Sequence, residues 1–190
     1  PASIVVIGIL TVVYTYFGGI KTVVWVDAVQ MGLHLFGALA TVIAVQLLVP
    51  SGWTNVLISS ATAGKMQLLD FSLDPTVSYT IFAGLFGGSV FTMASHGTDQ
   101  LIVQRLLTCK DQRSAQKALV GSGVVVLIQF FLFLMAGLGL WAFYGGRQFE
   151  SPDEIFATFI VQQLPPGLTG FLIAGVFAAA MSSLSSSINS

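Results

Sequence analysis

Charged residues are scarce in this sequence. Asp, Glu, Lys and Arg make up 8% of the 190 residues, whereas an average soluble domain has about a quarter. Because 55% of the residues are hydrophobic, we expect most of the protein surface to contact a lipid bilayer. The net charge of −1 lacks the basic excess that nucleic acid requires, which excludes that class of partner.

Cysteine is nearly absent as well. Cys109 is the single cysteine, so no internal disulfide forms, and no Cys or His cluster has the spacing of a zinc or iron–sulfur site. An intramembrane aspartyl protease would need Asp27 and Asp99 to share a proton at one depth, and no Gly-rich motif presents either acid. We therefore predict that the chain is not an enzyme.

Long apolar runs dominate what remains. About 20 apolar residues cross the hydrocarbon core as a helix, and these runs lack the alternation of barrel strands. We predict an all-α, polytopic transmembrane helical bundle, a single incomplete domain over residues 1–190. The predicted spans are 2–17, 23–49, 78–109 (interrupted near 95–100), 118–144 and 167–190. Since the chain opens at Pro1 without methionine and stops directly after the last run, we expect a fragment of a longer protein.

Basic residues indicate the orientation of the spans. Four of the seven lie in the polar segment between the third and fourth runs: Arg105, Lys110, Arg113 and Lys117. The positive-inside rule places this segment in the cytoplasm. Alternation then places Lys21 inside and the connections 50–77 and 145–166 outside. In the latter, Ser151 before Pro152, followed by two acids, predicts a short helix over 152–163.

Asp27 is an ionisable residue near the cytoplasmic end of the second span. Such residues inside spans are costly and indicate functional sites. The alternative is an acid that begins a helix at the membrane interface, where the helix dipole favours negative charge. Both interpretations stay open at this point.

The third run is interrupted by small polar residues at 95–100. A helix broken at membrane depth exposes backbone groups that a cavity or ligand must satisfy. We therefore predict a solute cavity lined by Ser95, His96, Thr98 and Gln100. The alternative is that the span ends near Ser95 and the remainder is an interfacial loop and helix.

The last run ends in a serine cluster. Residues 179, 182 and 183 share one helical face, which brings two hydroxyls beside a small residue. Neutral oxygens of this kind suit Na⁺, although further ligands from another helix would be needed. The alternative is that these small residues serve close helix packing.

Three motifs resemble those of the sodium:solute symporter family, which includes the sodium/glucose cotransporters. They are FGGIKTVVWVDAVQ at 17–30, GTDQLIVQR at 97–105 and AAAMSSLSS at 178–186. The resemblance implies a ten-helix core of two inverted five-helix repeats, of which these spans resemble core helices four to eight. It also implies a secondary active transporter of the plasma membrane that couples Na⁺ influx to uptake of a small organic solute by alternating access.

The resemblance assigns roles to particular residues. The Ala179 carbonyl and the Ser182 and Ser183 hydroxyls match the family's sodium site, and Asp27 matches an acid on the ion exit path. Sugar-transporting members carry an aromatic pair and a lysine where this chain has Ser95, His96 and Val126, which speaks against a sugar. A transport-inactive sensor or structural membrane subunit of the same family is the alternative function.

Overall fold

Helices account for every regular element that the structure describes. The structure is a computed structural model and describes residues 2–67, 69–74, 76–77, 79–147 and 149–189. Its helices are α1 (Ala2–Leu48), α2 (Gly52–Thr62), the π-helical η1 (Ala83–Gly87), α3 (Gly88–Thr98), α4 (Gln100–Leu107), α5 (Gln112–Phe143), α6 (Asp153–Gln163) and α7 (Pro166–Asn189). The predicted all-α helical bundle is confirmed.

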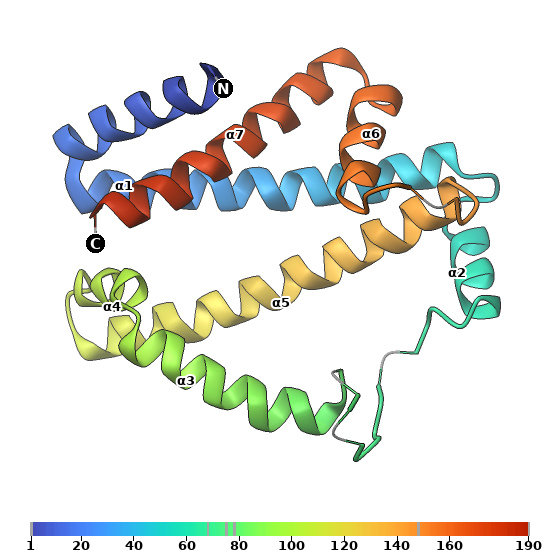
Figure 1. Ribbon diagram of the computed structural model, residues 1–190, viewed down its shortest axis with the longest axis horizontal. Coiled ribbons are helices and arrows are strands. Elements are labelled where there is room, and N and C mark those ends of the chain that lie inside the picture. The colour runs from blue at the N-terminus through green and yellow to red at the C-terminus, as the bar shows by residue number, and fades with distance from the viewer. Residues whose placement is uncertain (1, 68, 75, 78, 148, 190) are drawn as a thin grey trace.

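The first two predicted spans fall in α1, which is divided at Gly19. This residue has φ 55° and ψ −163°, a conformation that glycine adopts readily. The neighbouring Gly18 is close to Thr22, whose hydroxyl would lie 2.1 Å from an added Cβ. At this point the N-terminal part of α1 folds back over the longer part, which runs across the molecule (Figure 1).

The long part of α1 packs against α7 and α5. Phe36 and Phe171 meet edge to face with their ring centroids 5.3 Å apart, joining α1 to α7. On the other side, a Cβ added at Gly139 of α5 would lie 2.7 Å from a methyl group of Val45, a fully buried residue of α1. Small residues at such contacts let helices approach closely, which is how membrane helices gain packing energy.

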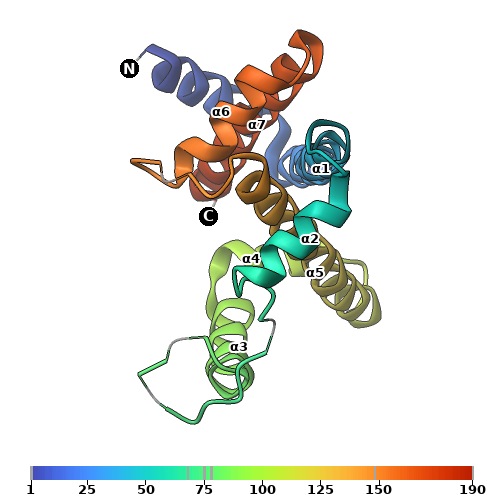
Figure 2. The ribbon, with the colours of Figure 1, turned by 90° about the vertical axis from the view of Figure 1, so that its right-hand side faces the viewer.

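The segment after residue 80 extends away from this three-helix core. It begins as a helix at Ile81, passes through the π-helical turn η1 and continues as α3 to Thr98. Asp99 is extended, with φ −70° and ψ 115°, and α4 follows it. Figure 2 shows α3 standing apart from α1 and α7.

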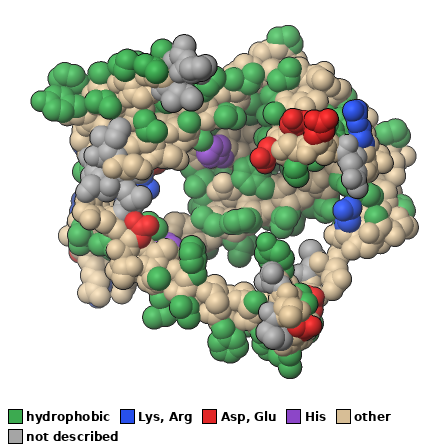
Figure 3. Space-filling view, in the orientation of Figure 1, with side chains coloured by type: hydrophobic (Ala, Val, Ile, Leu, Met, Phe, Trp, Pro, Cys, Tyr) green, Lys and Arg blue, Asp and Glu red, His purple; other side chains and the backbone are tan. Residues whose placement is uncertain are grey.

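The helix break, the short helices and several helix ends lie at two ends of the bundle. One end holds the Gly19 break, α4, the start of α5 and the C-terminal end of α7, and the other holds α2, α6 and the end of α5 (Figure 1). Apolar side chains cover much of the surface between the ends, whereas charged ones cluster towards them (Figure 3). This distribution is typical of a protein whose middle lies in a bilayer.

Three described helical segments are long and apolar enough to cross a membrane by themselves: Thr15–Leu48, Gln112–Phe143 and Pro166–Ser185. The predicted span 78–109 is instead shared among η1, α3 and α4. Its first residue, and the last residue of the predicted span 167–190, lie outside the described residues.

The short helix predicted over 152–163 is confirmed as α6. The two acids, Asp153 and Glu154, lie in its first turn as predicted, and no side-chain hydrogen bond caps it. The Ser151 backbone carbonyl instead accepts the Glu154 N–H at 3.1 Å.

Candidate ion and solute site

Asp27 lies where α1 runs alongside the C-terminal part of α7. It is eight residues beyond the break at Gly19, so it is past the first turn, where the helix dipole acts. The interpretation of Asp27 as an acid that begins a helix is therefore wrong. Its side chain is 22% exposed and points at groups from two other helices.

The first of these groups is the Ser182 hydroxyl of α7, which donates a hydrogen bond to Asp27 Oδ1. One helical turn along α1, the Gln30 amide donates to the Ala178 carbonyl. Gln30 is 4% exposed, so this bond is made in a buried position, where an unpaired amide would be costly. Two polar links thus fix the register of α1 against α7.

The second group at Asp27 is the Arg105 guanidinium of α4. Its Nη2 lies 2.7 Å from Asp27 Oδ2, so the two side chains form an ion pair. The carboxylate therefore bridges α4 and α7, and its negative charge is balanced. The sequence places Arg105 in the predicted cytoplasmic basic segment and does not predict this contact. The signal for it was its position within the GTDQLIVQR motif.

The serine cluster of α7 contains two pairs of oxygens. The Ser183 hydroxyl donates to the Ala179 carbonyl at 3.4 Å, and the fully buried Ser185 hydroxyl donates to the Ser182 carbonyl at 3.0 Å. Ala179 and Ser182 are half-buried and Ser183 is exposed. The three residues nominated for sodium thus occupy one stretch of α7 beside Asp27. Among the described residues, no cluster of three or more His, Cys, Asp or Glu could hold a metal ion.

A cavity of about 420 Å³ opens beside the Asp27–Arg105 pair. It lies between α1, the end of α3, α4 and the start of α5, and both charged residues and His96 line it. The other three residues predicted for the solute cavity do not line it. Ser95 instead contacts His96, with its Oγ 3.0 Å from Nδ1, and the Thr98 hydroxyl donates to the Ala94 carbonyl of its own helix.

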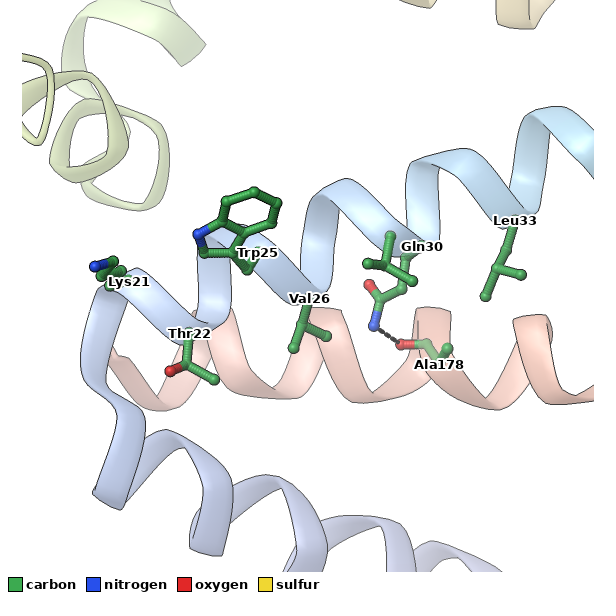
Figure 4. A pocket seen from close by; sticks show the side chains of 8 residues that line it. Lys21, Thr22, Trp25, Val26, Gln30, Leu33 and Ala178 are labelled. Atoms are coloured by element: carbon green, nitrogen blue, oxygen red, sulfur yellow. Dashed lines mark hydrogen bonds between the residues drawn. The ribbon is translucent and has the colours of Figure 1, made fainter.

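A further cavity, of about 380 Å³, lies along the contact of α1 with α7. Figure 4 shows Val26 and Leu33 on its apolar side and the Gln30 amide reaching the Ala178 carbonyl of α7. Lys21 and Trp25 stand at its end near the Gly19 break. The cavity is mostly apolar, with the Gln30–Ala178 link as a polar feature in its wall.

These features define a class of protein: a polytopic helical membrane protein with a broken helix and with paired polar groups between spans. Comparison with known proteins makes the class specific. The profile of the sodium:solute symporter family matches residues 1–190. The chain belongs to the sodium:solute symporter family.

Individual relatives are similar over nearly the whole chain. Sodium-coupled monocarboxylate transporter 2 of Danio rerio is 31% identical, over 98% of this chain and 31% of that protein. The sodium/sialic acid symporter SiaT of Proteus mirabilis is also 31% identical, over 98% and 39%. The human sodium/iodide cotransporter is 28% identical, over 99% and 30%. The chain thus spans about a third of the length of these relatives.

A solved structure shares the fold. It is the substrate-bound, outward-open state of a Na⁺-coupled sialic acid symporter, with a TM-score of 0.82 and 28% sequence identity. The similarity covers 98% of this chain and 40% of that one. The helices described above therefore have the arrangement of one part of a transporter.

Proposed function

We propose that this chain is part of a secondary active transporter that couples Na⁺ influx to uptake of a small organic solute by alternating access, in the plasma membrane. One observation carries the proposal. The Ser182 hydroxyl of α7 is hydrogen-bonded to the Asp27 carboxylate of α1, directly beside the Ala179–Ser183 pair. Family membership supports it, because the family is defined by sodium-coupled solute transport.

In this proposal, sodium is held by the Ala179 carbonyl and the Ser182 and Ser183 hydroxyls. Neutral oxygen ligands suit a hard monovalent cation, since they compensate its lost hydration without binding it too tightly to leave. Three ligands are too few for Na⁺, so the remainder come from parts of the transporter outside this chain. The Asp27 carboxylate, already bonded to Ser182, is the first anionic group on the ion's exit path.

Sodium binding acts through population shift. Bound Na⁺ stabilises the outward-open state and so raises the affinity for solute, by the reciprocity of linked equilibria. One charge crossing a 100 mV potential contributes about 2.3 kcal/mol, and a tenfold sodium gradient adds about 1.4 kcal/mol. The sum of about 3.7 kcal/mol supports roughly 500-fold accumulation of a neutral solute per sodium ion.

The solute cavity is proposed around His96 rather than around all four residues of the 95–100 segment. His96 lines the 420 Å³ cavity together with Arg105 and Asp27, and Ser95 orients its ring through Nδ1. Thr98 and Gln100 remain proposals without a contact to this cavity. Relatives named for a monocarboxylate and for sialic acid make a small organic acid the first solute to test.

The test of the sodium site needs no knowledge of the solute. Thermal unfolding of the full-length protein is measured in NaCl and in KCl, for wild type and for Ser182→Ala/Ser183→Ala. A ligand that binds the folded state stabilises it by RT ln(1 + [L]/Kd), about 1.4 to 2.7 kcal/mol at ten to a hundred times Kd. We expect a sodium-specific rise in melting temperature in wild type and none in the double variant.

The matched control is Ser59→Ala/Thr62→Ala in α2. These two hydroxyls bond to carbonyls of their own helix, as that of Ser183 does, so their loss reproduces the general effect of removing two helix hydroxyls. The control should keep the sodium-specific shift. If Ser182→Ala/Ser183→Ala showed the same sodium-specific shift as wild type, those serines would not be sodium ligands.

A further inference from the structure

A histidine that the proposed sodium and solute sites do not use lies in the long part of α1. His34 is half-buried and belongs to the segment Thr15–Leu48, which is long and apolar enough to cross a membrane. Ionisable residues inside spans are costly and commonly serve a function. Its ring has no hydrogen-bond partner among the described residues, so the imidazole does not link α1 to a neighbouring helix.

His34 borders a small cavity where four helices meet. The cavity has about 80 Å³, and its lining residues come from α1, α5, α6 and α7. Among the described residues that line it, His34 has the one polar side chain, and Phe133, Phe156 and Leu172 are typical of the rest. Since a water molecule takes about 30 Å³ in the liquid, the cavity has room for about two. Water there would give a proton a route to the ring.

Contacts between α1 and α7 pair their residues in antiparallel order. The pairs are Asp27 with Ser182, Gln30 with Ala178, Leu33 with Gly175, and Phe36 with Phe171. Figure 4 shows Gln30 and Leu33 turned towards α7. His34 is four residues beyond Gln30 and seven beyond Asp27, which places it on the same face of α1. The order of the pairs brings it level with Ala174 of α7.

This register sets the distance from His34 to the proposed sodium ligands. Ala179 lies five residues beyond Ala174, and Ser182 lies eight beyond it. At a rise of 1.5 Å per residue, these separations along α7 are about 8 and 12 Å. Two unit charges about 10 Å apart, at an effective dielectric constant of about 20, change each other's binding by about tenfold. A positive charge on His34 therefore weakens sodium binding at this site.

The other charged groups on the helices around His34 are balanced or exposed. Asp27 lies two turns away along α1, and Arg105 balances its charge. Asp153 and Glu154 lie in the first turn of α6 and are exposed, so water and salt screen them. The sequence of α7, and that of α5 after Lys117, contains no charged residue. A sodium ion at the proposed site would thus be the unbalanced charge on the face of α7 that His34 meets.

We propose that His34 is a proton-binding site that opposes sodium binding. The inference rests on the proposed sodium site at Ala179, Ser182 and Ser183. Histidine ordinarily changes its charge between about pH 5 and 8, so acid converts the imidazole of His34 to the imidazolium. The positive charge then lowers the affinity for sodium, and by reciprocity bound sodium lowers the affinity for the proton. Acid therefore slows sodium-coupled uptake.

The test is the sodium affinity of the purified full-length protein, without solute, at about pH 8 and about pH 5. The Kd is obtained from the melting temperature as NaCl replaces KCl at constant ionic strength. In wild type we expect the Kd to rise about five- to tenfold at the lower pH. In His34→Gln and in His34→Asn it should be equal at both pH values. The control is His96→Gln, which removes the other of the two histidines and should keep the change.

A second measurement needs no variant. Addition of NaCl to weakly buffered wild type at about pH 6.5, the ordinary midpoint of histidine titration, should release protons. KCl at the same concentration should release none. No sodium-specific release overturns the proposal.

Failure of the sodium site and failure of the His34 proposal give different results. If sodium did not change the melting temperature of wild type at either pH, the sodium site would be wrong, and the His34 proposal with it. If sodium bound with the same Kd at both pH values, the His34 proposal alone would be wrong. A pH dependence that survives in folded His34 variants, or disappears in His96→Gln, also overturns it. Melting temperatures in KCl show whether each variant is folded.

Discussion

At the scale of single residues, the main feature of Asp27 is that its carboxylate contacts two other helices. Its two carboxylate oxygens are held by different helices, Oδ1 by the Ser182 hydroxyl and Oδ2 by the Arg105 guanidinium. Arg105 is 37% exposed, so water screens the pair and its net contribution to stability is small, about 0–1 kcal/mol. The carboxylate therefore contributes little to stability, and its charge compensates that of Arg105 beside the proposed exit path.

The residue-scale prediction concerns this charge. Asp27→Asn keeps an oxygen that accepts from Ser182 but removes the negative charge that balances Arg105, which leaves an uncompensated cation beside the proposed exit path. We expect sodium release to slow by about tenfold, equivalent to about 1.4 kcal/mol in the barrier, with a smaller effect on solute affinity. Pre-steady-state currents or stopped-flow measurements of transport by the full-length protein would measure both.

Asp153→Asn, an acid in the first turn of α6 at the opposite end, is the control for loss of one carboxylate and should leave the release rate unchanged. If Asp27→Asn weakened solute binding and left sodium release intact, Asp27 would not belong on the exit path.

At the scale of elements, the breaks in the helices position the polar groups. The turn at Gly19 directs the second part of α1 along α7, and the extended residue Asp99 lets α4 leave the direction of α3. Arg105 reaches Asp27 because α4 is a separate short helix. The start of α5 is fixed differently, since Asp111 caps it by accepting the Ser114 N–H at 2.7 Å.

The element-scale prediction follows from that cap. Hydrogen bonds from the Ser114 backbone and side chain hold the pKa of Asp111 below its usual value of 3.8. A carboxyl group whose pKa is lower in the folded state stabilises above its unfolded-state pKa, and the stabilisation is lost as the pH falls through the folded pKa. Asp111→Ala should therefore lower hydrogen-exchange protection at residues 112–115 at neutral pH.

In wild type the same loss of protection should appear as the pH falls below about 4, close to the ordinary carboxyl pKa. Protection factors, which correct for intrinsic exchange rates, measure both effects. Asp74→Ala is the control, because Asp74 also has a lowered pKa from bonds to Thr76 but lies far along the chain from α5. Unchanged protection in Asp111→Ala would mean that the cap does not hold the first turn of α5.

At the scale of the whole molecule, the arrangement separates two polar ends by an apolar middle. One end is formed by α4, the start of α5 and the C-terminal end of α7, and the other by α2, α6 and the end of α5 (Figure 1). The Asp27–Arg105 pair, which involves α4, and the proposed sodium site on α7 belong to the first end. The basic segment 105–117 belongs to the first end. If it is cytoplasmic, as the positive-inside rule predicts, the proposed ion exit faces the cytoplasm, which is the direction that sodium-driven uptake requires.

The whole-molecule prediction tests that orientation with the single cysteine of the chain. Cys109 is half-buried and lies in the basic segment. In a full-length protein otherwise free of cysteine, a membrane-impermeant maleimide should label Cys109 in inside-out vesicles and leave it unlabelled in right-side-out vesicles. Cys109→Ser/Ser151→Cys moves the thiol to the loop before α6, and we expect the opposite pattern. Labelling of Cys109 from the outside would show that the orientation is the reverse of the predicted one.

The sequence by itself determined the helical class, the apolar segments, the short helix α6 and the family motifs. These properties depend on the local composition and on the period of the apolar residues, both of which are present in the sequence itself. It also brought Ala179, Ser182 and Ser183 onto one face, because three and four residues along a helix are neighbours.

Tertiary structure alone decided which side chains meet. Ser182 and Asp27 are 155 positions apart in the sequence, and the Gln30 and Ala178 pair spans 148, so no local pattern predicts either bond. The same holds for Arg105, whose place in a basic segment indicates only the orientation of the spans, and for Thr98, whose hydroxyl bonds within its own helix. Hydrogen bonds and ion pairs act over a few ångströms, and only the packing of α1, α4 and α7 brings these partners within that range.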